Sequence, residues 1–279
     1  MLTSLRYYLI IPILFIGVDA VAQDTNLWDN WTTEEIAAGV NWKSYHGENY
    51  FDSKQSINII EVDMESAEME LEFAYHDSLL IKTSEFGAEN EAVAAINGTF
   101  FDMSGGGSVV FFKMNGEVIT RGAVSRRLYS ESGGVGIDDD GEISIVQRPE
   151  DGWLSHDGVP SILGSGPLLI LSGEFRNQNN DAFNQNRHPR TAVGITQNGM
   201  LLLVTIDGRS SSAYGMSTPE LAEFLAEKGA EYALNLDGGG STTMWIDGAG
   251  VVNYPSGNGQ YDHGGERPVA NVLLLKQKN

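Results

Sequence analysis

The sequence of 279 residues contains no cysteine. Disulfide bridges, thiolate zinc sites, cysteine nucleophiles and a lipid-modified amino-terminal cysteine are therefore excluded together. Any chemistry that this chain performs must use oxygen and nitrogen side chains.

Basic residues are also scarce, with 17 Lys and Arg against 38 Asp and Glu, so the formal charge is 17 − 38 = −21. Proteins that bind a phosphate backbone need a surplus of basic side chains, because binding depends on displaced counterions. The composition argues against a nucleic-acid partner and against non-specific binding to an anionic membrane.

Proline is rare as well, with 8 residues, whereas glycine is abundant, with 33. The glycines follow no Gly-X-Y period, which excludes a collagen-like chain and indicates many tight turns between short strands. Because 41% of the residues are hydrophobic, the chain can bury a sizeable core, and wholesale disorder is excluded.

Long apolar runs are missing except near the amino terminus. There, Arg6 precedes twelve apolar residues from Tyr7 to Val18, and an A-x-A pattern follows at Ala20 to Ala22. This arrangement predicts a signal peptide over residues 1–22, since the run is too short for a membrane-spanning helix. We expect a secreted or periplasmic protein with no stable membrane insertion after cleavage, and a mature chain of 279 − 22 = 257 residues.

Hairpins dominate the remaining pattern. The turn pairs Asn115-Gly116, Asp140-Gly141 and Asn198-Gly199 each separate two short apolar segments, as expected where antiparallel strands reverse direction. Further strands are predicted at Ser56 to Met64 and Met69 to Tyr75, which would form a hairpin with each other. The other expected strands are Ala92 to Ile96, Ala230 to Leu236, Thr242 to Ile246, Val251 to Asn253 and Val269 to Leu275.

One helix is strongly signalled between Thr218 and Lys228, where Ser217 and Glu220 have the spacing of a capping box and Gly229 follows. A shorter helix is expected at Thr83 to Glu91. The predicted class is α+β, with a strand-dominated mixed sheet and few helices. We expect a single compact domain in which residues 23–92 pack as an amino-terminal segment on a catalytic part, residues 93–279.

The most informative motif is a glycine-rich loop that leaves a buried strand. Three glycines in succession let a backbone approach a ligand and aim several N–H groups at an anion. An acid precedes the glycines, and hydroxyl residues follow them. The candidate residues are Asn235, Asp237, Gly238, Gly239, Gly240, Ser241 and Thr242.

A second acid, Asp207, follows the apolar strand from Leu201 to Ile206. The capped helix lies between Asp207 and Asp237, so we expect the chain to cross over and place the two preceding strands as parallel neighbours. Both carboxylates would then lie on one rim. Paired carboxylates across a cleft are what glycoside cleavage uses, although an ordinary Asp-Gly turn explains Asp207 about equally well.

Arginines stand at the entrances of two strands, Arg190 before Thr191 and Arg267 before Val269. In so acidic a chain they are candidates for an anion clamp, because guanidinium binds phosphate or carboxylate in a bidentate manner. Asn97 ends the strand from Ala92 to Ile96, where its amide could read a sugar hydroxyl.

The ordered set of these segments resembles the phosphodiester glycosidase family. The matching blocks are Asn97 to Phe101, Pro189 to Gly194, Ile206 to Arg209, Asn235 to Thr242, and Arg267 before the last strand. The resemblance implies hydrolysis of a sugar-1-phosphodiester, of the N-acetylglucosamine-1-phosphodiester type, to free sugar and a phosphomonoester. It also suggests a role in exopolysaccharide or cell-surface glycan metabolism.

By position, the resemblance implies Asp237 and Asp207 as catalytic residues, in roles that stay open. The implied substrate-binding residues are Asn97, Arg190, Asn235, Gly238, Gly239, Gly240, Ser241, Thr242 and Arg267. We expect a carbohydrate phosphodiester as the partner, with no cofactor and no metal.

Three alternatives stay open. The first is a secreted glycan-binding protein without catalysis. The second is a serine hydrolase that uses Ser241, although no G-x-S-x-G elbow is present. The third is metal-assisted hydrolysis through Asp207, Asp237 and His188, although no metal-binding spacing supports it.

Overall fold

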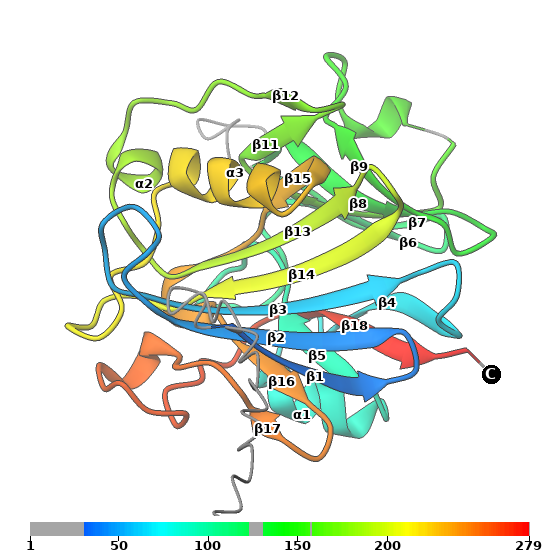
Figure 1. Cartoon of the computed structure of the whole chain (residues 1–279). Coiled ribbons are helices and arrows are strands. Elements are labelled where there is room, and N and C mark those ends of the chain that lie inside the picture. Colours follow the sequence, from blue (N-terminus) through cyan, green and yellow to red (C-terminus); the bar gives the residue numbers. More distant parts are fainter. Residues whose placement is uncertain (1–30, 123–130, 157, 279) are drawn as a thin grey trace, which may run out of the picture.

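The computed structural model describes residues 31–122, 131–156 and 158–278. Its strands form three antiparallel sheets, and its helices are few and short (Figure 1). The predicted signal peptide lies outside the described residues and stays a prediction. No helix in the described part of the chain is long and apolar enough to span a membrane.

The largest sheet has eight strands in the order β1-β2-β3-β14-β13-β15-β11-β12. Their bounds are β1 Trp31–Ala37, β2 Val40–Gly47, β3 Gln55–Asp63, β14 Met200–Ile206, β13 Arg190–Thr196, β15 Ala230–Asn235, β11 Leu168–Leu171 and β12 Glu174–Phe175.

Two five-stranded sheets complete the structure, in the orders β7-β6-β10-β8-β9 and β17-β16-β5-β18-β4. The first contains β7 Glu117–Arg121, β6 Phe111–Met114, β10 Ser161–Ser165, β8 Gly133–Ile137 and β9 Ile143–Gln147. The second contains β17 Gly250–Val251, β16 Met244–Ile246, β5 Ala94–Asn97, β18 Asn271–Gln277 and β4 Met69–Tyr75.

The helices are α1 Thr83–Glu89, α2 Ala182–Gln185 and α3 Thr218–Glu227, with short 3-10 turns at η2 Trp153–Ser155, η3 Gly239–Ser241 and η4 Ser256–Asn258. Helix α3 begins as its sequence predicts. The Ser217 hydroxyl accepts the Glu220 N–H while the Glu220 carboxylate accepts the Ser217 N–H, which is a capping box.

The core lies on both faces of the large sheet. Successive residues of a strand point to opposite faces, and β14 follows this rule: Leu203 packs towards the small sheets, whereas Leu202 and Val204 pack with Phe224 of α3. Both faces of the central strands are therefore covered by packed side chains, and the ends of these strands lie at the rim of the sheet.

Several sequence predictions are confirmed. The fold is a strand-dominated α+β arrangement. The turns at Asn115-Gly116, Asp140-Gly141 and Asn198-Gly199 connect paired strands, namely β6 with β7, β8 with β9, and β13 with β14.

Two predicted pairings are wrong. Strands β3 and β4 form no hairpin, because β3 pairs with β2 and β14 while β4 pairs with β18 of another sheet. The strands before Asp207 and Asp237 are not neighbours either, since β13 lies between β14 and β15 and is antiparallel to both. The short helix α2 lies in the segment between β12 and β13.

Candidate active site

Three neighbouring strands bring the site segments to one rim of the large sheet. Strands β14 and β15 run in the same direction on either side of β13, with Ile206 opposite Arg190 and Asn235 opposite Ala192. Asp207 and Asp237 thus leave the sheet beside the start of β13. Two strand spacings separate their backbones, about 9.5 Å. The two acids share a rim, as expected, without being adjacent.

Each of the three glycines after Asp237 makes room for a different group. A Cβ at Gly238 would lie 2.6 Å from the carbonyl oxygen of Pro189, and one at Gly239 would lie 2.9 Å from a guanidinium nitrogen of Arg209. A Cβ at Gly240 would lie 2.6 Å from Cζ of Arg267. Because real Cβ atoms essentially never approach this closely, the glycines allow two arginines to lie against the loop.

Arg209 and Arg267 supply the positive charge at this loop. Arg209 is exposed and Arg267 is half-buried. Within the described residues, neither side chain forms an ion pair within 4.0 Å of a carboxylate. In a chain with a net charge of −21, two arginines without an ion pair that lie against one loop form a local site for an anion.

Asp237 precedes the glycines against which these arginines lie, and the residue is partly exposed. Burial raises its pKa above the ordinary value for Asp, while the Ser241 hydroxyl, the Gly238 N–H, Arg267 and Arg209 act in the opposite direction. The Gly238 N–H donates to Asp237 Oδ1 at 2.9 Å. The Gly238 N–H thus orients the carboxylate of a residue that is partly open to solvent.

Asn97 fixes the position of the glycine loop from its buried side. Its side chain is fully buried, and its Nδ2 donates to the Asp237 carbonyl at 2.8 Å. Its Oδ1 accepts the Thr191 hydroxyl at 2.6 Å and the Thr243 N–H at 3.1 Å. These bonds occupy the amide on both sides, so in this structure Asn97 positions the loop instead of presenting itself to a ligand.

Asp207 is buried, with 1% of its surface exposed. Its Oδ2 accepts the Ser56 hydroxyl at 2.6 Å, and its Oδ1 accepts the Asn253 Nδ2 and the Tyr254 N–H, both at 2.9 Å. Burial raises its pKa, and these three hydrogen bonds and His263 lower it only in part. Of the two acids, Asp237 is therefore the more exposed residue.

Arg190 is also buried, with 1% exposure. Its guanidinium donates to the carbonyls of Met216 at 2.9 Å, Phe183 at 2.6 Å and Asn186 at 3.2 Å. Burial, with a smaller effect of Arg209, lowers its pKa to about 10. Arg190 holds the segment around α2 on the rim, and the free guanidinium groups at the loop are those of Arg209 and Arg267.

Most N–H groups of the glycine loop are used within the protein. Gly238 donates to Asp237, Gly239 to the Pro189 carbonyl at 2.9 Å, and Ser241 to the Gly238 carbonyl at 3.2 Å. Only the Gly240 N–H has no partner among the described residues. The expected cluster of anion-binding N–H groups is thus reduced to one in this structure.

The remaining predicted residues lie beneath the loop. Asn235 is buried and donates through Nδ2 to the Gly166 carbonyl at 2.9 Å. The hydroxyls of Ser241 and Thr242 are buried and have no hydrogen bond of standard geometry within the described residues. These side chains support the loop from the core side.

Metal binding gains no support from the site. The described part of the chain contains no group of three or more His, Asp or Glu side chains that could hold a metal ion. His188 lies beside the rim, where burial, Arg190 and Arg209 lower its pKa. The nearby charges are mainly cationic, an environment suited to an anionic ligand.

Arg209 is the site residue that the sequence did not single out as binding. It directly follows Asp207-Gly208, and its backbone has a φ of +61°, which is unusual for a residue other than glycine. The Asp-Gly-Arg segment can be found in the sequence. The contact of Arg209 with Gly239, 30 residues further along the chain, could not be predicted from the sequence.

Arginines that lie against a glycine-rich loop suit the binding of a phosphate group, because guanidinium binds phosphate in a bidentate manner. The family profile of the phosphodiester glycosidases matches residues 90–276. The chain belongs to the phosphodiester glycosidase family, whose characterised homologues are hydrolases. The resemblance seen in the sequence is confirmed.

Two curated relatives are the mouse and human proteins named N-acetylglucosamine-1-phosphodiester alpha-N-acetylglucosaminidase. The mouse protein is 32% identical over 182 residues, which are 58% of this chain and 33% of the mouse protein. The human protein is 30% identical over 167 residues, which are 52% of this chain and 32% of the human protein. The matched region thus spans about a third of these relatives.

Solved structures show the same fold. The catalytic domain of the zebrafish N-acetylglucosamine-1-phosphodiester alpha-N-acetylglucosaminidase, auto-inhibited by its pro-peptide, matches with a TM-score of 0.66 at 21% identity. That match covers 88% of this chain and 87% of the zebrafish chain. A protein from Synechocystis matches with a TM-score of 0.67 at 16% identity and covers 88% of this chain and 63% of that one.

Proposed function

We propose that this protein hydrolyses a sugar-1-phosphodiester at the bond between the anomeric carbon and the phosphate oxygen. The products are the free sugar and a phosphomonoester. The observation that carries the proposal is the partly exposed Asp237 at the start of a glycine loop against which the guanidinium groups of Arg209 and Arg267 lie, both of which lower the pKa of Asp237. Family membership supports the same reaction class.

The chemistry of the leaving group suits this charge pattern. When the anomeric C–O bond breaks, its electron pair moves to the phosphate oxygen, and the diester monoanion becomes a monoester dianion. The second pKa of such a monoester is about 6, so the leaving group is a weak base and needs little general-acid help. Stabilisation of the added negative charge is what matters, and Arg209 and Arg267 supply it.

Asp237 acts at the sugar carbon in this proposal. Its carboxylate stabilises the oxocarbenium-like centre, either as the nucleophile or as the base that activates water. Asp207 supports the site from beneath, because its carboxylate is buried and accepts hydrogen bonds from Ser56, Asn253 and Tyr254. Asn97 and Arg190 position the two flanking segments.

We further propose that the protein acts outside the cytoplasm, in exopolysaccharide or cell-surface glycan metabolism. Export rests on the signal-peptide pattern over residues 1–22. We also propose that residues 23–92 form an amino-terminal segment and that the catalytic part begins at residue 93. Family and substrate chemistry favour a glycan phosphodiester as the natural substrate.

The test is a release assay on N-acetylglucosamine 1-phosphodiesters, with both products identified. We expect free sugar and the phosphomonoester from the wild type, and a loss of turnover of at least about 10²-fold in Asp237→Asn with the fold intact. Binding of the diester without release of sugar would instead establish a non-catalytic glycan-binding protein. Release of a sugar 1-phosphate would place the cleavage at the other ester bond and overturn the proposal.

A further inference from the structure

A thioether lies against one of the two arginines at the glycine loop. The Sδ of Met103 is 4.0 Å from Nη1 of Arg267, although the two residues are 164 positions apart in the chain. The Met103 side chain is open to solvent, since 64% of the residue is exposed. Methionine is usually a core residue, so an exposed methionine beside a candidate anion site calls for a functional explanation.

The loop that carries Met103 holds it in place through its own hydrogen bonds. The Asp102 N–H donates to the Gly107 carbonyl at 3.1 Å, and the Asp102 carbonyl accepts the Gly106 N–H at 2.9 Å. At Gly106, where φ is +74°, a Cβ would lie 2.7 Å from the carbonyl of Ser78, so the loop packs directly on the neighbouring segment. The thioether therefore has a defined place beside the guanidinium group.

Met103 is the most exposed methionine among the described residues. The chain has no cysteine, so methionine supplies all of its sulfur. Three other described methionines are buried, with at most 1% exposure, and three are only partly exposed. The buried ones are Met69, Met216 and Met244, and the partly exposed ones are Met64, Met114 and Met200. Because sulfur that solvent can reach is the more readily oxidised, an oxidant in solution meets Met103 first.

Oxidation turns a weak hydrogen-bond acceptor into a strong one at this position. With hydrogen peroxide, the thioether sulfur gives up two electrons, an S–O bond forms as the O–O bond breaks, and the second oxygen leaves as water with both peroxide protons. The product, methionine sulfoxide, is polar, whereas a thioether sulfur is a weak acceptor. Within the described residues, Arg267 has no carboxylate within 4.0 Å, so no ion pair competes with the new oxygen for its N–H groups.

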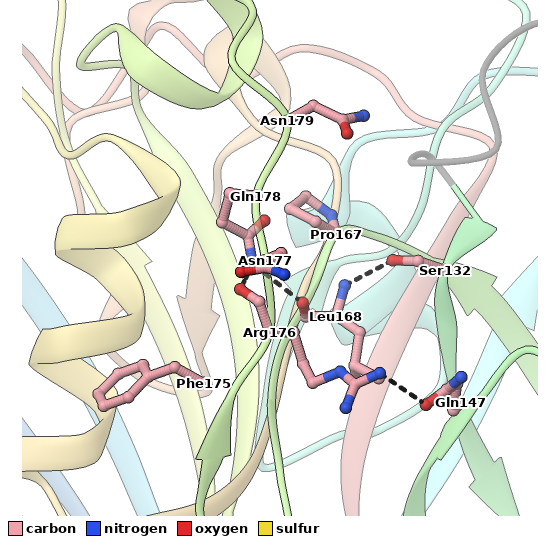
Figure 2. A pocket seen from close by; sticks show the side chains of 9 residues that line it. All are labelled: Ser132, Gln147, Pro167, Leu168, Phe175, Arg176, Asn177, Gln178 and Asn179. Carbon is pink, nitrogen blue, oxygen red and sulfur yellow. Dashed lines mark hydrogen bonds between the residues drawn. The ribbon is translucent and has the colours of Figure 1, made fainter.

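An arginine that donates to an uncharged side-chain oxygen is present elsewhere in the molecule. In the hollow shown in Figure 2, Arg176 Nη2 donates to Gln147 Oε1 at 3.2 Å. The oxygen of a glutamine amide and the oxygen of methionine sulfoxide each lie one bond beyond the δ atom of an unbranched side chain. Glutamine at position 103 would therefore imitate both the reach and the polarity of the oxidised methionine.

We propose that Met103 is a modification site, and that its oxidation to the sulfoxide by peroxide lowers the affinity of the glycine loop for phosphate. The sulfoxide oxygen occupies N–H groups of Arg267 that phosphate would otherwise bind, because guanidinium binds phosphate through two parallel N–H groups. Methionine sulfoxide reductases restore the thioether, so the effect is reversible. The inference rests on the proposed function for its effect on hydrolysis and on the anion site alone for its effect on binding.

The first experiment treats the protein with hydrogen peroxide and follows two quantities. One is the oxygen gained by each methionine peptide, measured by mass spectrometry, and the other is kcat/KM on the methyl diester of N-acetylglucosamine 1-phosphate. We expect Met103 to gain oxygen before Met200. As it does so, kcat/KM should fall about tenfold, since a hydrogen bond to a charged group changes binding by this order. Methionine sulfoxide reductases A and B, with dithiothreitol as the reductant, should restore the activity.

Three variants assign the effect to one sulfur. Met103→Leu keeps an apolar side chain of similar size, and its kcat/KM should be the same before and after peroxide. Met200→Leu is the matched control, because it removes a partly exposed methionine at the end of β14 away from Asp207, and it should lose activity with peroxide as the wild type does. Met103→Gln should have a higher KM than Met103→Leu without any peroxide.

Two sets of results would overturn the modification site. The first is an equal loss of activity in Met103→Leu and the wild type, or oxidation of Met103 that leaves kcat/KM unchanged. The second is a KM of Met103→Gln equal to that of Met103→Leu, since the glutamine oxygen would then have no effect on Arg267.

Binding of inorganic phosphate separates this inference from the proposed function. If the methyl diester is not hydrolysed, the proposed function fails, and phosphate is titrated by NMR against the wild type and Met103→Leu, each before and after peroxide. A Kd that rises about tenfold on oxidation of the wild type, and stays constant in Met103→Leu, would still support the modification site. Absence of phosphate binding, an unchanged Kd, or a rise that Met103→Leu shares would reject it.

Discussion

Substitution of Gly240 by Ala tests most directly whether catalysis depends on the close packing of Arg267 on the glycine loop, because it changes no charge. The new Cβ would lie 2.6 Å from Cζ of Arg267, whereas an ordinary contact begins at 3.4 Å. The guanidinium must therefore move by at least 3.4 − 2.6 = 0.8 Å. A misplacement of about 1 Å in a catalytic group can lower the rate by about 10²-fold.

We accordingly expect Gly240→Ala to lower kcat/KM on an N-acetylglucosamine 1-phosphodiester by about 10²-fold, or about 2.7 kcal/mol in the barrier. The free energy of unfolding should change by less than about 1 kcal/mol, because the atoms displaced belong to the end of a flexible side chain and Ala restricts the unfolded chain. Initial rates of sugar release and thermal unfolding measure the two quantities.

Gly158→Ala is the matched control. A Cβ there would meet nothing within 4 Å, and the residue lies outside the site. It should retain wild-type activity and stability. If Gly240→Ala also kept wild-type kcat/KM while Arg267→Ala lost activity, the close packing of Arg267 on the glycine loop would not matter for catalysis. Unfolding of Gly240→Ala would show instead that the loop has a structural role.

Four further predictions concern Asp207, the pKa of Asp237 and the side-chain amide of Asn97. Asp207→Asn should keep the fold, because the new Nδ2 can face the Ser56 hydroxyl. Asp207→Ala leaves the N–H donors of Asn253 and Tyr254 unpaired and should lower the free energy of unfolding by about 3 kcal/mol. Equal stability of the two variants in urea would contradict this. Burial raises the pKa of the Asp207 carboxyl, so its contribution to stability is lost as pH rises through the folded-state pKa, and Asp207→Asn should gain stability relative to the wild type over that rise. Arg267→Ala should move the acid limb of the kcat/KM profile to higher pH, because Arg267 lowers the already raised pKa of Asp237; an unmoved limb would mean that Asp237 is not the titrating group. Asn97→Ala should lower both kcat and the melting temperature, and loss of stability with full kcat per folded molecule would remove its positioning role.

Local signals predicted much of the fold. The Asn-Gly and Asp-Gly turns each connect paired strands, because a short turn fixes both the partner and the direction of the return. The capping box placed the start of α3 at Thr218. These features depend on residues that are close in sequence.

Pairing over longer distances was predicted less well. Residues Ser56 to Val62 form an almost unbroken buried run in β3, whereas β4 alternates between buried and partly exposed positions. A strand buried on both faces belongs in the centre of a sheet, and that difference in burial separates the two strands. The insertion of β13 between β14 and β15 follows from its hairpin with β14, which occupies the side where β15 was expected.

The candidate site shows the same difference between local signals, which the sequence predicted well, and long-range contacts, which it predicted less well. Asp237 and its glycines could be found from their order in the sequence, whereas the contacts of the arginines could not. Arg190 and Arg267 looked equivalent at the entrances of strands, but the Arg190 guanidinium is bound by three backbone carbonyls. Arg209 acquires its place at the loop only through the folded arrangement of β14 and β15.

The pairing of β5 has a consequence for how the protein folds during its synthesis. Asn97 ends this strand, and β5 pairs on one side with β16, residues 244–246, and on the other with β18, residues 271–277. Both partners leave the ribosome long after Asn97 does, and contacts between such distant segments form slowly. A nascent chain that stops short of residue 271 lacks β18, one of the two partners of β5, so we expect β5 and Asn97 to take their final places only once synthesis has passed β18.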